Sequence, residues 1–203
     1  MRAEPSRRPI AAVVLAAGTS SRMGKNKLFL SLQGQSVLRR AVGTAVAAGL
    51  DPVLVVLGHE AERARAELEG LPCTSVLNPA YAQGINTSLR TGIAAVPEQS
   101  AAALVMLADM PFVTKEMLKT LIERYQGSSS PLVVSSYEGV DAPPMLYDRS
   151  LFAELRALDG DGCGKKVVKR HRKESLEVAW PASALQDLDV PADVDQARAE
   201  LGA

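Results

Sequence analysis

The sequence predicts a three-layer α/β fold, in which a mostly parallel central sheet carries helices on both faces. Short apolar runs bounded by Gly or Pro, such as 10–15 and 52–57, are typical of strands buried on both faces of a parallel sheet. Helical segments separate these runs, so strand and helix alternate through residues 10–125. Helical connections between parallel strands are right-handed, and this favours a parallel sheet with helices on both faces.

The predicted elements follow one another with recognisable start and stop signals. Gly49 is a plausible end for the first helix, because glycine readily adopts the left-handed conformation found there. Thr114 is a good N-cap for a later helix. The predicted strands are 10–15, 52–57, 73–77, 103–107, 132–136 and 176–179, and the predicted helices are 35–49, 60–69, 87–95, 114–125, 148–158, 164–171 and 191–201.

Length and composition indicate a single domain over residues 1–203. Hydrophobic residues make up 47% and charged residues 23% of the chain, which is ordinary for a soluble globular protein. Basic and acidic side chains balance at 23 each, so no overall field attracts nucleic acid or an anionic membrane. The apolar stretch near the N-terminus is too short to span a membrane. We therefore expect a cytoplasmic protein without nucleic-acid or membrane partners, in which Cys73 and Cys163 are reduced thiols.

The loop after the first strand, residues 15–27, is predicted to bind phosphate groups. It is rich in small residues, which let the backbone approach a ligand closely, and its exposed N–H groups form an anion-binding concavity. Arg22 and Lys27 supply positive charge for a triphosphate. The spacing is that of neither a P-loop nor a dinucleotide-binding turn. A solvated Gly/Ser turn with surface cations is the alternative interpretation.

The pattern of this loop, Leu-Ala-Ala-Gly-x-Ser-x-Arg-Met-Gly-x-x-Lys, resembles the signature loop of the sugar-phosphate and cofactor nucleotidyltransferases, most closely their MobA-like branch. The resemblance covers nearly the whole chain and implies a fold like that of nucleotide-diphospho-sugar transferases. The Ala-Ala-Gly version is similar to that of cytidylyltransferases, whereas guanylyl-transferring molybdenum cofactor enzymes more often show Ala-Gly-Gly. The nucleotide-binding residues that the resemblance implies in this loop are Leu15, Ala16, Ala17, Gly18, Ser21, Arg22 and Lys27, of which Arg22 and Lys27 are also expected to be catalytic.

A second segment, residues 78–92, resembles the family stretch that closes over the nucleobase. The match implies that Gly84 and Ser88 lie against the base. The helix that begins near Thr87 also has free N–H groups at its first turn. The alternative interpretation is a polar helix cap with Arg90 on the surface.

The predicted metal ligands are two acids, Asp109 and Asp189, and Asp109 is also expected to be catalytic. Asp109 directly follows a buried apolar strand, where a carboxylate is costly unless it lies in a cleft or is paired. It resembles the Asp of the family's Asp-x-Pro metal loop, which implies a Mg²⁺ ligand, whereas a role as helix cap is the alternative. Residues 185–193 resemble a second acidic family motif, which makes Asp189 the chosen second ligand and Asp187 the alternative. Mg²⁺ needs only one or two carboxylates besides phosphate oxygens and water.

The acceptor side is predicted in a small subdomain at about residues 136–180. Residues 142–152 and 160–166 resemble a turn, a helix and a glycine-rich segment of molybdenum cofactor cytidylyltransferases, with small departures at Ala142 and Gly162–Gly164. Gly164, Lys165 and Lys166 open a probable helix and are expected to bind the acceptor's phosphate. The alternative is that these lysines are solvated.

The resulting hypothesis is a Mg²⁺-dependent transfer of CMP from CTP to a phosphorylated acceptor, molybdopterin, with release of pyrophosphate. The two histidines belong to no nucleophile–base arrangement, and an ionised phosphate nucleophile needs no general base. Docking to a molybdoenzyme or its chaperone would follow from that acceptor. Two other functions remain open: a sugar- or alditol-phosphate nucleotidyltransferase, and a non-catalytic nucleotide-binding accessory protein for molybdoenzyme maturation.

Overall fold

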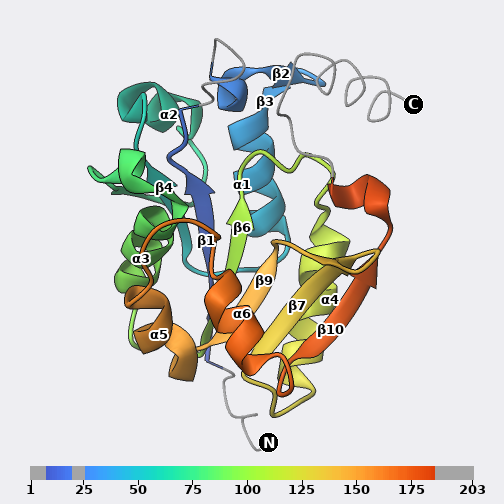
Figure 1. The fold of residues 1–203 in the computed structure, drawn as a ribbon. Coiled ribbons are helices and arrows are strands. Elements are labelled where there is room, and N and C mark those ends of the chain that lie inside the picture. Colours follow the sequence, from blue (N-terminus) through green and yellow to red (C-terminus); the bar gives the residue numbers. More distant parts are fainter. Residues whose placement is uncertain (1–7, 20–25, 186–203) are drawn as a thin grey trace, which may run out of the picture.

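A central eight-stranded sheet organises the molecule (Figure 1). The computed structural model describes residues 8–19 and 26–185. The strand order is β10-β7-β9-β6-β1-β4-β5, and β8 pairs with β7 beside this path. The strands are β1 (Ile10–Ala16), β4 (Val53–Leu57), β5 (Thr74–Leu77), β6 (Ala102–Leu107), β7 (Leu132–Tyr137), β8 (Val140–Asp141), β9 (Met145–Asp148) and β10 (Leu176–Trp180).

The sheet is mostly parallel, with β1 at its centre. Val14 of β1 pairs with Val55 of β4 on one side and with Met106 of β6 on the other, both in parallel register. All seven residues of β1 are buried, as the continuous apolar run predicts. The antiparallel strand β9 lies between β6 and β7, and the sequence did not indicate it. Strand β10 pairs in parallel with β7 at the edge of the sheet.

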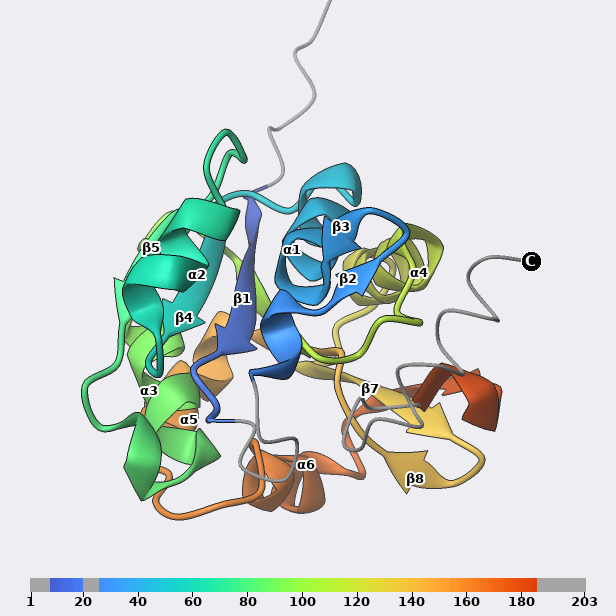
Figure 2. The ribbon, with the colours of Figure 1, turned by 90° about the horizontal axis from the view of Figure 1, so that it is seen from above.

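Helices cover both faces of this sheet (Figures 1 and 2). Side chains of β1 alternate between two cores: Ala12 and Val14 belong to one, and Val13 and Leu15 belong to the other. This alternation follows from the two-residue period of a strand. The first core includes α1 (Val37–Ala47), α2 (Ala61–Glu67) and α4 (Lys115–Gln126), and the second includes α3 (Ile85–Ala95), α5 (Phe152–Arg156) and α6 (Lys165–His171). The predicted three-layer fold is confirmed.

Several element boundaries differ from the predictions. A short hairpin of β2 (Ser31–Leu32) and β3 (Gln35–Ser36) precedes α1, so this helix begins two residues later than predicted, with the Ser36 hydroxyl accepting from Arg39 N. The predicted helix at 148–158 is divided into the end of β9, a 3-10 turn and α5. Asp148 caps that turn by accepting from Ser150 N. The predicted helix at 191–201 lies outside the described residues.

The segment predicted to form an acceptor-side subdomain contributes β8, β9 and β10 to the central sheet and α6 to one of its faces. Within the described residues, no helix is long and apolar enough to cross a membrane. The short 3-10 turns η2 (Lys27–Phe29), η3 (Tyr81–Gln83), η4 (Arg149–Leu151) and η5 (Ala182–Leu185) complete the elements.

Candidate functional site

The loops that follow β1, β4 and β6 meet at the carboxyl edge of the sheet. The Ala108 amide donates to Leu15 O at 3.0 Å, and the His59 amide donates to Ala17 O at 3.3 Å. Leu15, Ala16 and Ala17, which the sequence assigned to the nucleotide, are buried at this edge, whereas Gly18 is exposed. A side chain added at Gly18 would meet no atom within 4 Å, so open space adjoins the loop. Ligands of open α/β sheets bind at such edges.

Lys27 and Asp109 come together at this edge. Lys27 Nζ lies 2.6 Å from Asp109 Oδ2, and the two side chains are only 13% and 21% exposed. Lys27 begins the turn η2, whose cap Asn26 accepts from Leu28 N at 3.2 Å, and this fixes the direction in which the chain leaves the loop. Two of the predicted catalytic residues are thus in direct contact, although they lie far apart in the sequence.

The alternative role of Asp109 as a helix cap is wrong. Thr114 occupies the N-cap of α4, and its hydroxyl accepts from Met117 N at 3.2 Å. Asp109 stands well before that helix and faces Lys27 instead. The carboxylate therefore belongs to the carboxyl edge of the sheet and not to the start of α4.

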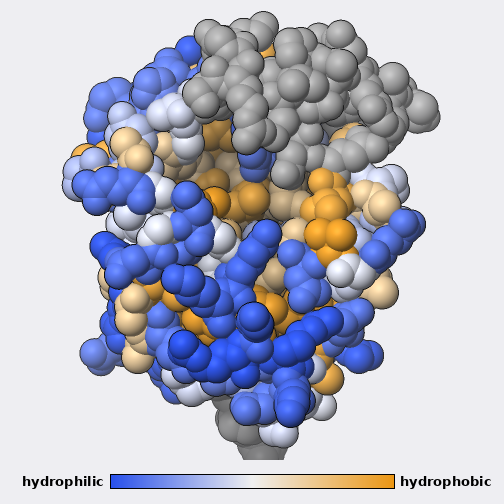
Figure 3. Space-filling view, viewed as in Figure 1, coloured by the Kyte–Doolittle hydropathy of each residue, from blue (hydrophilic) through white to orange (hydrophobic). Residues whose placement is uncertain are grey.

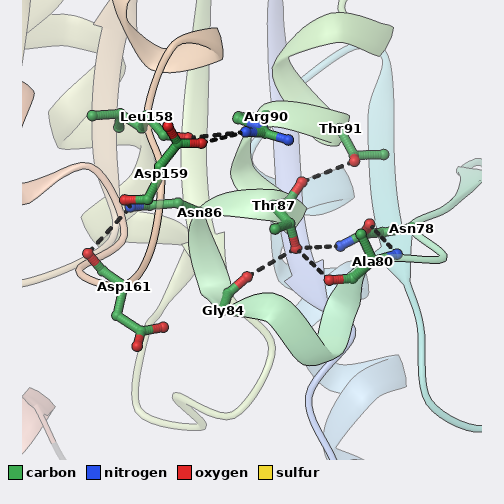
Figure 4. A network of polar contacts seen from close by, with 10 residues as sticks. All are labelled: Asn78, Ala80, Gly84, Asn86, Thr87, Arg90, Thr91, Leu158, Asp159 and Asp161. Carbon is green, nitrogen blue, oxygen red and sulfur yellow. Dashed lines mark hydrogen bonds and ion pairs between the residues drawn. The ribbon is translucent and has the colours of Figure 1, made fainter.

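On the neighbouring side, Asn78 organises the segment expected to close over the base (Figure 4). Its Nδ2 donates to the hydroxyls of Thr87 and Ser88, each at 2.9 Å, and its Oδ1 accepts from Ala80 N at 3.0 Å. Ser88 is buried, so its hydroxyl holds the loop in place in the free protein. The expected contact of Ser88 with a base stays a prediction.

Asn86 connects this segment to the loop 159–164 (Figure 4). The side chain is 1% exposed, and its Nδ2 donates to Asp159 O at 3.0 Å and to Asp161 O at 3.1 Å. Its Oδ1 accepts from Gly164 N at 3.2 Å. At the surface, Arg90 adds an ion pair with Asp159 at 2.7 Å. The start of α3 and the loop 159–164 are therefore one hydrogen-bonded unit.

The sequence reasoning missed Asn86, although a signal for it exists. Asn86, Leu89 and Ile93 have the i, i+3, i+7 spacing of one helical face, and all three are buried. An asparagine on an apolar helical face must find hydrogen-bond partners when it is buried. The position of Asn86 on this buried face therefore indicates hydrogen bonds from its side chain to another segment.

Gly84 lies where these two segments touch. Its φ is +107°, and a Cβ there would lie 2.9 Å from Gly160 O and 2.7 Å from Asp161 Oδ1. A larger residue would be strained in conformation and would push the loops apart. Gly84 thus has a structural reason to be glycine, and its predicted contact with the base stays a prediction.

The residues predicted for the acceptor begin α6. Gly164 is the left-handed N-cap of this seven-residue helix, and Lys165 and Lys166 are exposed. Three amides of the turn bond within the protein: Gly164 N to Asn86 Oδ1, Lys165 N to Gly162 O and Val167 N to Gly164 O. A phosphate at this point would therefore depend on lysine side chains more than on the backbone donors that the sequence suggested.

Cys163 lies between the two halves of the site. Burial and, to a smaller extent, the Asp109 carboxylate raise the pKa of its thiol to about 12, against an opposing effect of Lys165. Both charges are thus within electrostatic reach of one side chain. The carboxyl edge of the sheet around Asp109 and the start of α6 are therefore close to each other in the fold.

This pKa predicts an unreactive thiol. Because the pKa is about 12 instead of 9.0, the thiolate fraction near neutral pH should be roughly 10³-fold smaller than for an ordinary cysteine. Iodoacetamide should therefore modify Cys163 far more slowly than free cysteine, as measured by mass spectrometry on a Cys73→Ser variant. Labelling at the rate of free cysteine would contradict the burial of this thiol.

The predicted metal site is only partly within the described residues. Asp109 is there, whereas Asp189, its alternative Asp187, and the loop residues Ser21 and Arg22 are outside them. The described part of the chain has no group of three or more His, Cys, Asp or Glu side chains suited to a metal. Mg²⁺ nevertheless needs only one or two carboxylates from the protein. The half-buried Asp109 carboxylate at the carboxyl edge of the sheet fits this requirement.

Comparisons with known proteins identify the family to which this chain belongs. The model of the MobA-like NTP transferase domain matches residues 12–175. Purine catabolism protein PucB of Bacillus subtilis (strain 168) is 31% identical over 92% of this chain and 94% of its own. Nicotine blue oxidoreductase of Paenarthrobacter nicotinovorans is 30% identical over 80% of this chain and 82% of its own.

Among solved structures, Rv0371c from Mycobacterium tuberculosis H37Rv has a TM-score of 0.82 and 29% identity, over 94% of this chain and 98% of that one. A second structure of the same protein, its complex with manganese, has a TM-score of 0.76 at 28% identity, with the same coverage. The matched region contains Lys27, Asp109 and Asn86, so the site just described lies within the shared domain. The chain belongs to the family of the MobA-like NTP transferase domain.

Proposed function

We propose that this protein is a nucleotidyltransferase that transfers CMP from CTP to the phosphate of an acceptor, molybdopterin, with the help of Mg²⁺. The observation that carries the proposal is the Lys27–Asp109 pair beside the open space at Gly18. A cation for phosphate oxygens and a carboxylate for a divalent metal stand side by side where α/β sheets bind their ligands.

In this reaction, an oxygen of the acceptor's phosphate attacks the α-phosphorus of the triphosphate. The bond from that phosphorus to the bridging oxygen breaks, and pyrophosphate leaves. Positioning and charge neutralisation carry most of such chemistry. Lys27 and Arg22 bind the triphosphate oxygens, and the phosphate nucleophile, already ionised, needs no base.

Asp109, with Asp189 as the proposed second ligand, would hold the metal. When bound, Mg²⁺ neutralises phosphate charge and polarises the phosphoryl group that is transferred. The manganese complex of Rv0371c supports a divalent ion in this family. In the free protein, Asp109 neutralises Lys27, so the cation is already placed at the edge before the nucleotide arrives.

The preference for CTP rests on the Ala16-Ala17-Gly18 version of the loop. Both alanine side chains are buried, so they support the loop by packing and offer the base no polar group. We expect CTP to bind more tightly than GTP in equilibrium titrations with Mg²⁺. Tighter binding of GTP would reject the cytidylyl assignment without affecting nucleotidyl transfer.

The choice of molybdopterin as the acceptor rests on two points. Residues 160–166 resemble a segment of molybdenum cofactor cytidylyltransferases, and Lys165 and Lys166 are exposed cations there. Pyrophosphate release, measured with a panel of triphosphates and candidate acceptor phosphates, tests the activity directly. Release that depends on a molybdopterin acceptor supports the proposal, and release with sugar or alditol phosphates alone rejects that acceptor. Nucleotide binding without any release would indicate an accessory protein.

A further inference from the structure

A short segment after β4 contacts the chain both before and after the predicted phosphate-binding loop. This segment, residues 59–63, leads from β4 into the first turn of α2. Before the loop, the His59 amide donates to Ala17 O at 3.3 Å. After the loop, the guanidinium group of Arg63 lies over the ring of Phe29, 4.0 Å from its centroid. The segment therefore connects two parts of the chain between which the loop runs.

The contact at Phe29 acts on the turn that carries Lys27. Lys27 is the first residue of η2 and Phe29 is the last, with the buried Leu28 between them. Lys27 Nζ lies 2.6 Å from Asp109 Oδ2 at the carboxyl edge of the sheet. Because η2 has only three residues, a side chain that holds Phe29 also restricts the direction of Lys27.

Glu60 orients the Arg63 side chain. Arg63 Nη1 donates to Glu60 Oε1 at 3.2 Å. The pKa of the Glu60 carboxyl lies below its ordinary value, chiefly because of Asn26, with smaller contributions from Arg63 and His59. Asn26 is the N-cap of η2. The Glu60 carboxylate is therefore close both to the start of this turn and to the cation that covers its last residue.

The backbone of Glu60 also indicates a function beyond α2. Its φ is +51° and its ψ is +38°, a left-handed conformation that is uncommon for a residue other than glycine. Glu60 is the N-cap of α2, yet its side chain makes no capping hydrogen bond. Strained residues are often found where the surrounding structure serves a functional site. Here the side chain of Glu60 contacts Arg63 instead of the free amides of its own helix.

Arg65 shows how a neighbouring arginine of α2 behaves without this contact. Like Arg63, it pairs with an acid three residues earlier, in this case Glu62. Among the described residues, the Arg65 side chain has no ion pair, hydrogen bond or ring contact outside α2. Figure 3 shows hydrophilic side chains over this helix at the upper left of the molecule. Arg63 thus differs from Arg65 in its contact with η2.

We propose that Arg63, oriented by Glu60, is a positioning residue for Lys27. It holds η2 by its contact with Phe29, so that the Lys27 ammonium group is directed at the triphosphate before the nucleotide binds. The inference rests on the proposed function, in which Lys27 binds the triphosphate. Arg63 itself contacts no substrate and acts only through the turn.

The test compares Arg63→Ala, Phe29→Leu and the double variant with Arg65→Ala as the control. Full-length proteins would be titrated by calorimetry with CTP, GTP and ATP, each with Mg²⁺ and without an acceptor. For the triphosphate that binds most tightly, each single variant should lose about threefold or more in affinity, because the cation–π contact is lost and Lys27 is less well directed. The double variant should lose no more than the weaker-binding single variant, because both changes remove the same contact. The control should bind like the unsubstituted protein.

Urea denaturation of the same proteins distinguishes positioning from stability. Arg63→Ala and Arg65→Ala should have similar midpoints, because each loses one exposed ion pair. A lower midpoint for Arg63→Ala with unchanged triphosphate affinity, or additive losses of affinity in the double variant, would overturn the inference.

Pyrophosphate release distinguishes a failure of this inference from a failure of the proposed function. Release by the unsubstituted protein, together with equal triphosphate affinities of Arg63→Ala and the control, would reject the role of Arg63 and leave nucleotidyl transfer standing. Triphosphate binding that is weakened in Arg63→Ala, without release with any acceptor, would reject the transfer but support the positioning of Lys27.

Discussion

Replacing Asp109 by Asn should lower metal-dependent pyrophosphate release by about 10²-fold or more, because a preorganised charge at the reacting phosphates is lost. The amide keeps the shape of the side chain but removes the negative charge that would hold the divalent ion. The decrease should appear in kcat/KM measured at a Mg²⁺ concentration that saturates the unsubstituted protein, and higher Mg²⁺ concentrations should restore only part of it.

The fold should survive this substitution. The Lys27 and Asp109 side chains are only 13% and 21% exposed, so the change has a cost, but the amide oxygen of the variant can still accept a hydrogen bond from the Lys27 ammonium. Thr114, and not Asp109, caps the following helix. Cys163 provides an independent readout, because removing the Asp109 charge should lower the thiol pKa and speed its alkylation at alkaline pH.

The matched control is Asp51→Asn, an exposed acid at the amino end of β4 and away from the carboxyl edge. It should leave pyrophosphate release unchanged. If Asp109→Asn retained the release rate of the Asp51 control, Asp109 would be only the structural partner of Lys27, and the metal assignment would be wrong.

Local signals predicted most of the fold. The strands β1, β4 and β6 are apolar runs between turn residues, and the predicted and observed ends of these strands and of β5 agree within one residue. Strand β9 was missed because it has only four residues, follows two prolines and obtains its pairing from β6 and β7, which lie elsewhere in the chain. The Asp148 cap was a real start signal, but for the turn η4 and not for one long helix.

The candidate site shows the same limit. Asp109 could be singled out because a carboxylate directly after a buried strand is costly unless it is paired or lies in a cleft. Lys27 could be singled out because it ends a glycine-rich loop. Neither position specifies their 2.6 Å contact, which depends on β1 and β6 being neighbours. The proximity of Asp141 and Met145 to α6 was also out of reach, because these residues approach the helix only through the unpredicted strands β8 and β9.

Asn86→Ala should destabilise the fold strongly, although Asn86 lies outside the transfer site. It would leave Gly164 N without its partner at a buried position, and the carbonyls of Asp159 and Asp161 without theirs at part-buried positions. A buried polar group that loses its hydrogen bond costs roughly 1–3 kcal/mol, so a loss of about 3 kcal/mol in the free energy of unfolding is expected. Urea denaturation measures this loss.

Arg90→Ala is the matched control, because Arg90 joins the same two segments by an exposed ion pair with Asp159. That pair should contribute less than about 1 kcal/mol. The two variants therefore compare a buried and an exposed link between α3 and the loop 159–164. A cost for Asn86→Ala no larger than that for Arg90→Ala would mean that this loop is held by other contacts.

The KM values of Asn86→Ala distinguish a role of Asn86 in positioning the two segments from a role in stability alone. Asn86 contacts no substrate in our proposal, but it aligns the base-side segment with the loop that leads into Lys165. Below the unfolding transition, Asn86→Ala should raise the KM for both the triphosphate and the acceptor, whereas Asp109→Asn should mainly lower kcat. Because one asparagine supports both sides, a variant that raised the KM for only one substrate would show that the two loops are positioned independently.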